Sequence, residues 1–129
     1  MSLAATALAA GVSCLLITLG RRGAIYVAAP GFDAIRDLPP RRGLATAPRG
    51  GTGAVGAVRT ALVPAEIVNP PGDPTGCGDV WGATYFSRMV GGDRLSDAMT
   101  AAGLAAARNV GHRGATGLAA HLRGELSLS

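Results

Sequence analysis

The chain has 129 residues, the length of one domain, which is enough to bury a hydrophobic core. Its 48% apolar and 16% charged residues exclude an intrinsically disordered chain. The formal net charge is +4, and every basic side chain apart from histidine is arginine. The absence of lysine excludes a Walker-type phosphate loop and Schiff-base chemistry. The arginines are scattered without interleaved aromatic residues, so we expect no nucleic-acid partner.

The apolar N-terminal segment, residues 1–19, resembles an export signal. Its basic residues, Arg21 and Arg22, follow the apolar stretch, whereas in a signal they precede it. We therefore expect no membrane segment, and we predict a short helix over 3–10 followed by a buried strand over 13–19. The two cysteines lie far apart in the sequence, which favours a reducing cytoplasmic location.

The middle of the chain is predicted to form a hairpin followed by a loop. Residues 20–23 predict a turn, and residues 24–28 predict a returning strand. Residues 29–53 are rich in proline, glycine and arginine without periodicity, which is typical of a loop or insertion. Residues 55–68 contain strand-like patches, and Pro64 argues against a central position in a sheet.

The second half of the chain is predicted to be mainly helical. A turn over 69–78 precedes a helix over 79–90, which ends at two glycines. An alanine-rich helix follows over 95–110. A turn over 111–117 and a short helix over 118–126 complete the predicted elements.

The most informative stretch runs from Asp73 to Asp79, with the sequence Asp-Pro-Thr-Gly-Cys-Gly-Asp. It predicts a glycine-rich turn that opens a helix, where backbone N–H groups without intrahelical partners can bind phosphate. Asp79 beside such a site is suited to take a proton from a hydroxyl that attacks a phosphoryl group. Cys77 is either a functional thiol or a small residue whose amide matters, and the lack of a nearby base favours the second.

A second glycine pattern, Gly51 to Gly56, matches the dinucleotide fingerprint G-x-G-x-x-G, with Asp73 about twenty residues further on. That fingerprint has meaning only after a strand, and here it follows proline- and arginine-rich loop sequence. We favour a flexible insertion, with a piece of a dinucleotide-binding oxidoreductase as the alternative.

Two landmarks carry a resemblance to a known family. The stretch from Asp73 to Asp79, with Gly82 and Ala83, resembles the C-terminal signature of the ribokinase (PfkB-type) carbohydrate kinases. The upstream stretch from Thr18 to Gly23, T-L-G-x-x-G after a strand, resembles another landmark of that family. The resemblance implies an α/β fold: the C-terminal half of a three-layer αβα Rossmann-like fold, without the N-terminal strands and lid. Residues 1–129 would then form a partial kinase domain.

The resemblance also implies roles for individual residues. Asp79 would be the catalytic base, and the backbone amides of three residues would form the anion hole: Gly76, Cys77 and Gly78. The nucleotide would be bound by Thr18, Gly20, Arg21, Gly23 and Gly103. Many members hold a monovalent cation such as potassium, here through Asp73 and the backbone near Thr75. The implied activity is transfer of the ATP phosphoryl group to a hydroxyl of a sugar or nucleoside, with magnesium.

The departures from the family pattern leave an alternative open. Complete members are more than twice as long, and the upstream N-x-x-E element that organises magnesium has no counterpart here. The chain would then work with a separate N-terminal half or as a homo-oligomer. The alternative is a catalytically inactive nucleotide-binding or interaction fragment of such a kinase.

Overall fold

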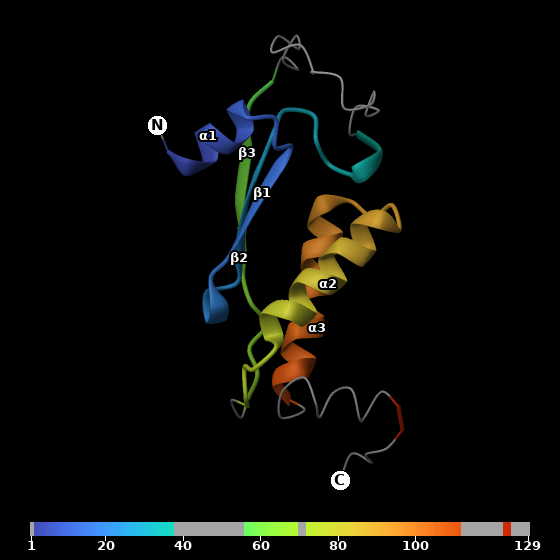
Figure 1. Cartoon of the computed structure of the whole chain (residues 1–129). Helices are drawn as coiled ribbons and strands as arrows, with labels where there is room; N and C mark the ends of the chain where they lie inside the picture. The colour runs from blue at the N-terminus through green and yellow to red at the C-terminus, as the bar shows by residue number, and fades with distance from the viewer. Residues whose placement is uncertain (1, 38–55, 70–71, 112–122, 125–129) are drawn as a thin grey trace.

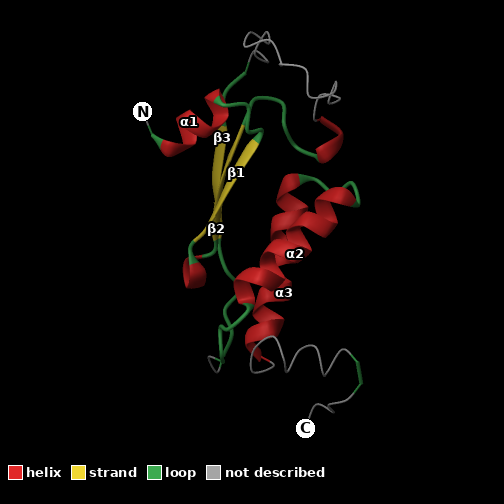
Figure 2. Cartoon of the chain, viewed as in Figure 1, coloured by secondary structure: helices red, strands yellow, loops and turns green. Residues whose placement is uncertain are grey.

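The computed structural model describes residues 2–37, 56–69, 72–111 and 123–124. Figures 1 and 2 show its elements, which follow one another along the chain as helices, strands and two short 3-10 turns. In order they are α1 (Leu3–Ala9), β1 (Cys14–Thr18), η1 (Gly20–Arg22), β2 (Ala24–Ala28), η2 (Ile35–Asp37), β3 (Arg59–Val63), α2 (Cys77–Val90) and α3 (Leu95–Gly111).

The sheet has three antiparallel strands in the order β1-β2-β3. The strand predicted over 24–28 is confirmed at those bounds, and the strand predicted over 13–19 is shorter by one residue at each end. β3 lies at the edge of the sheet and ends directly before Pro64, because proline has no N–H to donate to a neighbouring strand.

Both long predicted helices are present, with somewhat wider bounds. α2 begins two residues before its predicted start, and α3 extends to Gly111. The final helix predicted over 118–126 is wrong at its described residues: 123–124 form a turn, and Gly124 has a φ of +74°. A positive φ ends a right-handed helix, and glycine accepts it at little cost.

The core lies between one face of the sheet and the pair α2 and α3 (Figure 1). Two small side chains on β2, Ala24 and Ala28, are almost fully buried and allow the helices to approach closely. They pack with larger apolar side chains of the helices and of the segment after β2: Phe32, Met89, Leu95 and Met99. The fold is therefore a mixed α/β arrangement built on a small antiparallel sheet.

Several sequence predictions fall partly or wholly outside the described residues. Of the predicted loop over 29–53, residues 29–37 are described and contain η2. The dinucleotide-like pattern is outside them except for Gly56, which lies in a bend. Among the helices that are described, none has the length and apolar character needed to cross a membrane.

Candidate functional site

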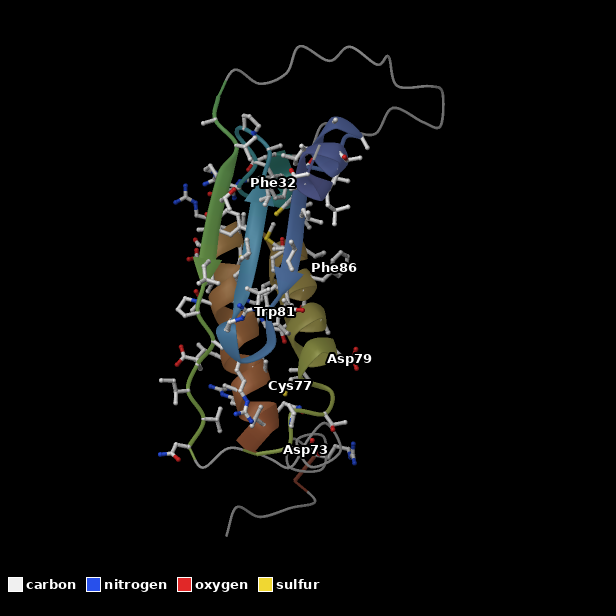
Figure 3. All side chains as sticks on the ribbon, turned by 90° about the vertical axis from the view of Figure 1, so that its left-hand side faces the viewer. Phe32, Asp73, Cys77, Asp79, Trp81 and Phe86 are labelled. Carbon is white, nitrogen blue, oxygen red and sulfur yellow. The ribbon has the colours of Figure 1, made fainter. Side chains whose placement is uncertain are left out.

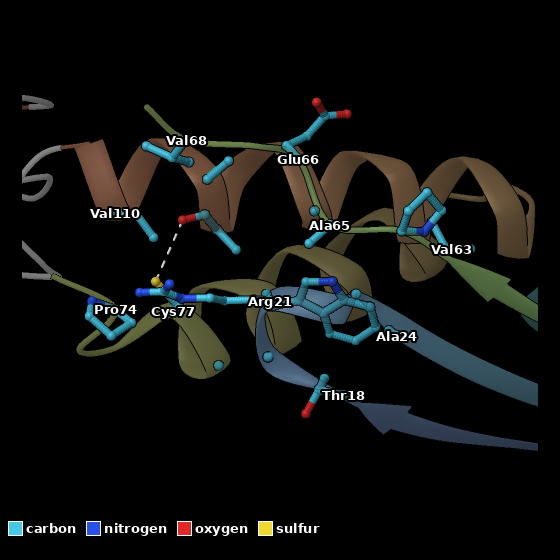
Figure 4. Close-up of a pocket in the computed structure, with 18 of the residues that line it drawn as sticks. Thr18, Arg21, Ala24, Val63, Ala65, Glu66, Val68, Pro74, Cys77 and Val110 are labelled. Carbon is cyan, nitrogen blue, oxygen red and sulfur yellow. Dashed lines mark hydrogen bonds between the residues drawn. The ribbon is translucent and has the colours of Figure 1, made fainter. Parts of the chain in front are cut away.

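A cavity of about 570 Å³ opens between the end of the sheet and the two long helices. Its walls come from the turn after β1, the segment that follows β3, the start of α2 and the middle of α3 (Figure 4). It brings together residues from both sequence landmarks: Thr18, Gly20, Arg21 and Gly23 with Cys77 and Gly78, and also Gly103. Stretches more than fifty residues apart in the sequence thus share one site.

The turn between β1 and β2 is built on two glycines. Gly20 has a φ of +59° and Gly23 a φ of +98°, and the Leu19 N–H donates to the Gly23 carbonyl at 2.7 Å. A β-carbon on Gly23 would overlap the Val63 carbonyl oxygen, so only glycine lets this turn pass the end of β3. The result is a tight corner from which the Arg21 side chain extends in the direction of the start of α2 (Figure 4).

The second landmark forms a turn that is held by its own side chains. One carboxylate oxygen of Asp73 accepts from the Thr75 hydroxyl at 2.6 Å and from the Thr75 amide at 2.9 Å. These hydrogen bonds, the hydroxyl's first, hold the pKa of Asp73 below its usual value. Gly76 then takes a left-handed φ of +78° as the N-cap of α2. Glycine is suited to that conformation because it has no β-carbon.

The backbone amides at this turn differ in availability. The Cys77 N–H, which the resemblance places in the anion hole, donates to the Pro74 carbonyl at 3.1 Å. The amides of Gly76 and Gly78 have no acceptor among the described residues. A β-carbon on Gly78 would meet no atom within 4 Å, so the space on that side of the residue is open. Two of the three expected donors are thus open, without an acceptor in the described part of the chain.

Asp79 lies in the first turn of α2, exposed, and its side chain projects at the lateral edge of the molecule (Figure 3). It has no hydrogen bond or ion pair within the described part of the chain, and it does not line the cavity. Asp73, Thr75 and Gly76 are also absent from the cavity lining. The carboxylate is therefore next to the open amides in sequence but outside the cavity itself.

The other walls of the cavity are mostly apolar. Trp81, which is the single tryptophan of the chain, stacks on Tyr85 with ring centroids 5.5 Å apart and planes 6° apart. Facing side chains come from the segment after β3 and from α3: Val68, Met99, Ala106 and Val110. Such a wall suits the flat, largely apolar face of a heterocycle, while Arg21 supplies positive charge.

Two core side chains outside the cavity lining have raised pKa values. Burial raises the pKa of the Tyr85 hydroxyl to about 12 and that of the Cys14 thiol to about 11. Both side chains pack against the core.

Asn109 is a residue of the site that the sequence analysis missed. Its side chain is fully buried, and its Nδ2 donates to the Thr75 carbonyl at 2.9 Å and to the Cys77 Sγ at 3.3 Å. A signal was present, because Asn109 continues the helical spacing of the buried residues of α3: Leu95, Ala98, Met99 and Ala102. An asparagine on an apolar helix face requires a polar partner. Here the partner is the turn formed by residues 73–78, the signature turn.

No group of three or more histidine, cysteine, aspartate or glutamate side chains with metal-binding geometry occurs in the part of the chain that the structure describes. Comparison with known proteins adds no relative: no protein-family model, curated protein or solved structure matches this chain.

Proposed function

We propose that this cavity binds ATP and that the chain takes part in transferring the γ-phosphoryl group to a hydroxyl of a sugar or nucleoside, as ribokinase-type kinases do. The proposal includes the fold: the α/β arrangement would be the C-terminal, nucleotide-binding half of a ribokinase-like three-layer structure. One observation carries it. Residues from both sequence landmarks line a single cavity, which lies next to open amides at the start of a helix.

The charge distribution supports a phosphate ligand at one end of the cavity. The amides of Gly76 and Gly78 lie at the positive end of the α2 dipole. Arg21 adds a full positive charge from the opposite wall. The adenine ring would then lie along the apolar wall that contains Trp81 and Gly103.

In the proposed reaction, Asp79 takes the proton of the acceptor hydroxyl while the oxygen of that hydroxyl forms a bond to the γ-phosphorus. The bond from that phosphorus to the bridging oxygen of ADP breaks, and ADP leaves with the electron pair. Magnesium would neutralise charge on the phosphate oxygens. The open amides stabilise the negative charge that the transferred group carries.

A second candidate is a chain that binds the nucleotide without transferring phosphate. The position of Asp79 favours it, because this carboxylate does not line the cavity. Release of ADP in the presence of a sugar or nucleoside separates the two functions. Binding without any acceptor-dependent ADP release would support the second candidate.

Nucleotide binding can be measured through Trp81, which is the only tryptophan and lines the cavity. We expect ADP and ATP to change its fluorescence with a saturable dependence on concentration. Gly78→Leu should weaken binding about tenfold or more, because Gly78 lines the cavity at the start of α2 and a leucine side chain there would take space from the nucleotide.

Gly82→Leu is the matched control, because Gly82 lies in the same helix, also has open space around it and does not line the cavity. The affinity of the Gly82→Leu variant for ADP should stay within about twofold of the parent value. This is a much smaller change than the tenfold loss expected for Gly78→Leu, which corresponds to about 1.4 kcal/mol. Absence of ADP binding to the parent chain, or equal affinities for the two leucine variants, would reject the proposed nucleotide site.

A further inference from the structure

The Thr75 carbonyl and the Asn109 side chain are held together although they lie 34 residues apart in the sequence. The amide orientation follows from the contact, because a carbonyl oxygen at 2.9 Å can accept only from the NH₂ group. The same NH₂ group reaches the Cys77 sulfur at 3.3 Å. Asn109 therefore fastens the turn of the signature to the C-terminal part of α3.

Two of the groups that the family resemblance assigns to a monovalent cation already accept hydrogen bonds from donors of the chain. One Asp73 carboxylate oxygen accepts two hydrogen bonds from Thr75. The Thr75 carbonyl accepts from Asn109. Carbonyl and carboxylate oxygens bind a cation through the same lone pairs. The Thr75 and Asn109 donors therefore compete with a cation for these oxygens.

We propose that the Asn109 side-chain amide replaces a monovalent cation as the group that holds the signature turn in its binding conformation. A carbonyl oxygen interacts through its lone pairs either with a bound cation or with the partial positive charge of an N–H donor. The NH₂ group of Asn109 can therefore take the place of a cation beside the Thr75 carbonyl. The amide is part of the fold, so the turn is formed without an ion. Asn109 is a positioning residue here, since it contacts the turn and does not line the cavity.

The other end of the same amide strengthens the assignment. The Asn109 Oδ1 is buried and has no hydrogen-bond partner in the described part of the chain. A buried acceptor without a partner is unfavourable. Asparagine is nevertheless the residue at this position, where its Nδ2 donates to the Thr75 carbonyl. We therefore infer that the hydrogen bond from the NH₂ group offsets the unfavourable burial of Oδ1.

The inference predicts that potassium has no effect on the parent protein. The melting temperature should agree within about 1 °C between potassium chloride and tetramethylammonium chloride at equal ionic strength. A bound cation that stabilised the fold by about 1 kcal/mol would instead raise the melting temperature by several degrees. A rise of several degrees in potassium would overturn the inference, because it would show a bound cation in the native state.

Asn109→Asp is the informative variant because it replaces the NH₂ donor by a carboxylate oxygen of the same shape. We expect its melting temperature to fall by about 5 °C or more in tetramethylammonium chloride, and potassium to restore part of that loss. Asn69→Asp, at an exposed position, is the control for the added charge and should respond to neither salt. An Asn109→Asp variant that melts like the parent in both salts would refute the role of Asn109.

The part of the inference that concerns phosphate binding rests on the proposed function, and a second readout tests it separately. The affinity for ADP, followed by Trp81 fluorescence, should be the same within about twofold in the two salts. If ADP does not bind in either salt, the proposed function fails while the melting data still decide the role of Asn109. If ADP binds only in potassium, the proposed function stands and the inference about Asn109 fails.

Discussion

A β-carbon on Gly23 would overlap the carbonyl oxygen of Val63, at the point where the turn after β1 passes the end of β3. Gly23 also has a φ of +98° and a ψ of −138°, a conformation that residues with side chains rarely adopt. We predict that Gly23→Ala lowers the free energy of unfolding by about 2–4 kcal/mol, from backbone strain and overlap together. Urea denaturation measures this value.

Gly11→Ala is the control for the overlap, because Gly11 has a similar φ of +93° but no atom within 4 Å of a β-carbon. Its cost should be limited to the backbone conformation, about 1 kcal/mol. Equal losses in the two variants would mean that the contact with Val63 contributes nothing.

Replacing Asp79 by asparagine tests the proposed base. With an acceptor that supports turnover, we expect ADP release to fall by about 10²–10⁴-fold, because the amide does not take the proton. Affinity for ADP should remain near the parent value, since Asp79 does not line the cavity. Asp97→Asn provides the comparison, because Asp97 occupies the first turn of α3 and is equally exposed. Unchanged turnover in Asp79→Asn would remove Asp79 from the mechanism.

The Asp73 carboxylate makes a pH-dependent contribution to stability. Its pKa in the folded chain lies below the usual 3.8, because the Thr75 hydroxyl and amide donate to the charged form. The contribution is therefore present above pH 3.8 and disappears as the pH falls through the lower folded value. Asp73→Ala should be less stable than the parent at neutral pH, with a difference that shrinks toward pH 2. Urea denaturation at several pH values measures this, and a difference independent of pH would contradict it.

One face of the sheet carries a row of apolar side chains that no described element covers. In the strand register Ile17, Ile25 and Leu62 are neighbours, and Ile17 and Leu62 are 40% and 55% exposed. Figure 1 shows α2 and α3 against the other face, with α1 beside the N-terminal end of β1. We predict that the double change Ile17→Thr and Leu62→Thr lowers self-association and binding of a hydrophobic dye.

Stability should change little in that double variant, by about 1 kcal/mol or less, because threonine suits strands and both positions are exposed. Phe86→Ser is the control, since Phe86 is 66% exposed on α2 and projects at the lateral edge of the molecule (Figure 3). Light scattering as a function of concentration measures association. A larger effect from Phe86→Ser would place the association surface on the helices.

Much of the secondary structure could be predicted because its signals are local. β-Branched and aromatic residues mark the strand Ala24–Ala28, and two glycines mark the end of α2. The error at Gly124 has the same origin: the apolar pattern of 118–126 favours a helix, but Gly124 adopts a positive φ. A periodic pattern does not reveal where one glycine turns the chain.

The candidate site was predictable only in part. The glycine turn and Asp79 follow from residues that adjoin in the sequence, because a helix start exposes amides whatever surrounds it. The availability of each amide does not follow, since the pairing of Cys77 with Pro74 depends on how the turn closes. The role of Asn109 also escaped, because its partner Thr75 belongs to another element.

The sequence by itself determined the three strands and the two long helices to within a few residues, because backbone preferences and hydrophobic periodicity act over short stretches. Only the tertiary structure decided that residues of the two landmarks, among them Arg21 and Cys77, line one cavity. It also decided that Asp79 lies outside the cavity and that Asn109 holds Thr75. These relationships depend on the packing of α2 and α3 against the sheet. That packing brings together residues that are far apart in the chain, and a local sequence pattern does not show which residues will meet.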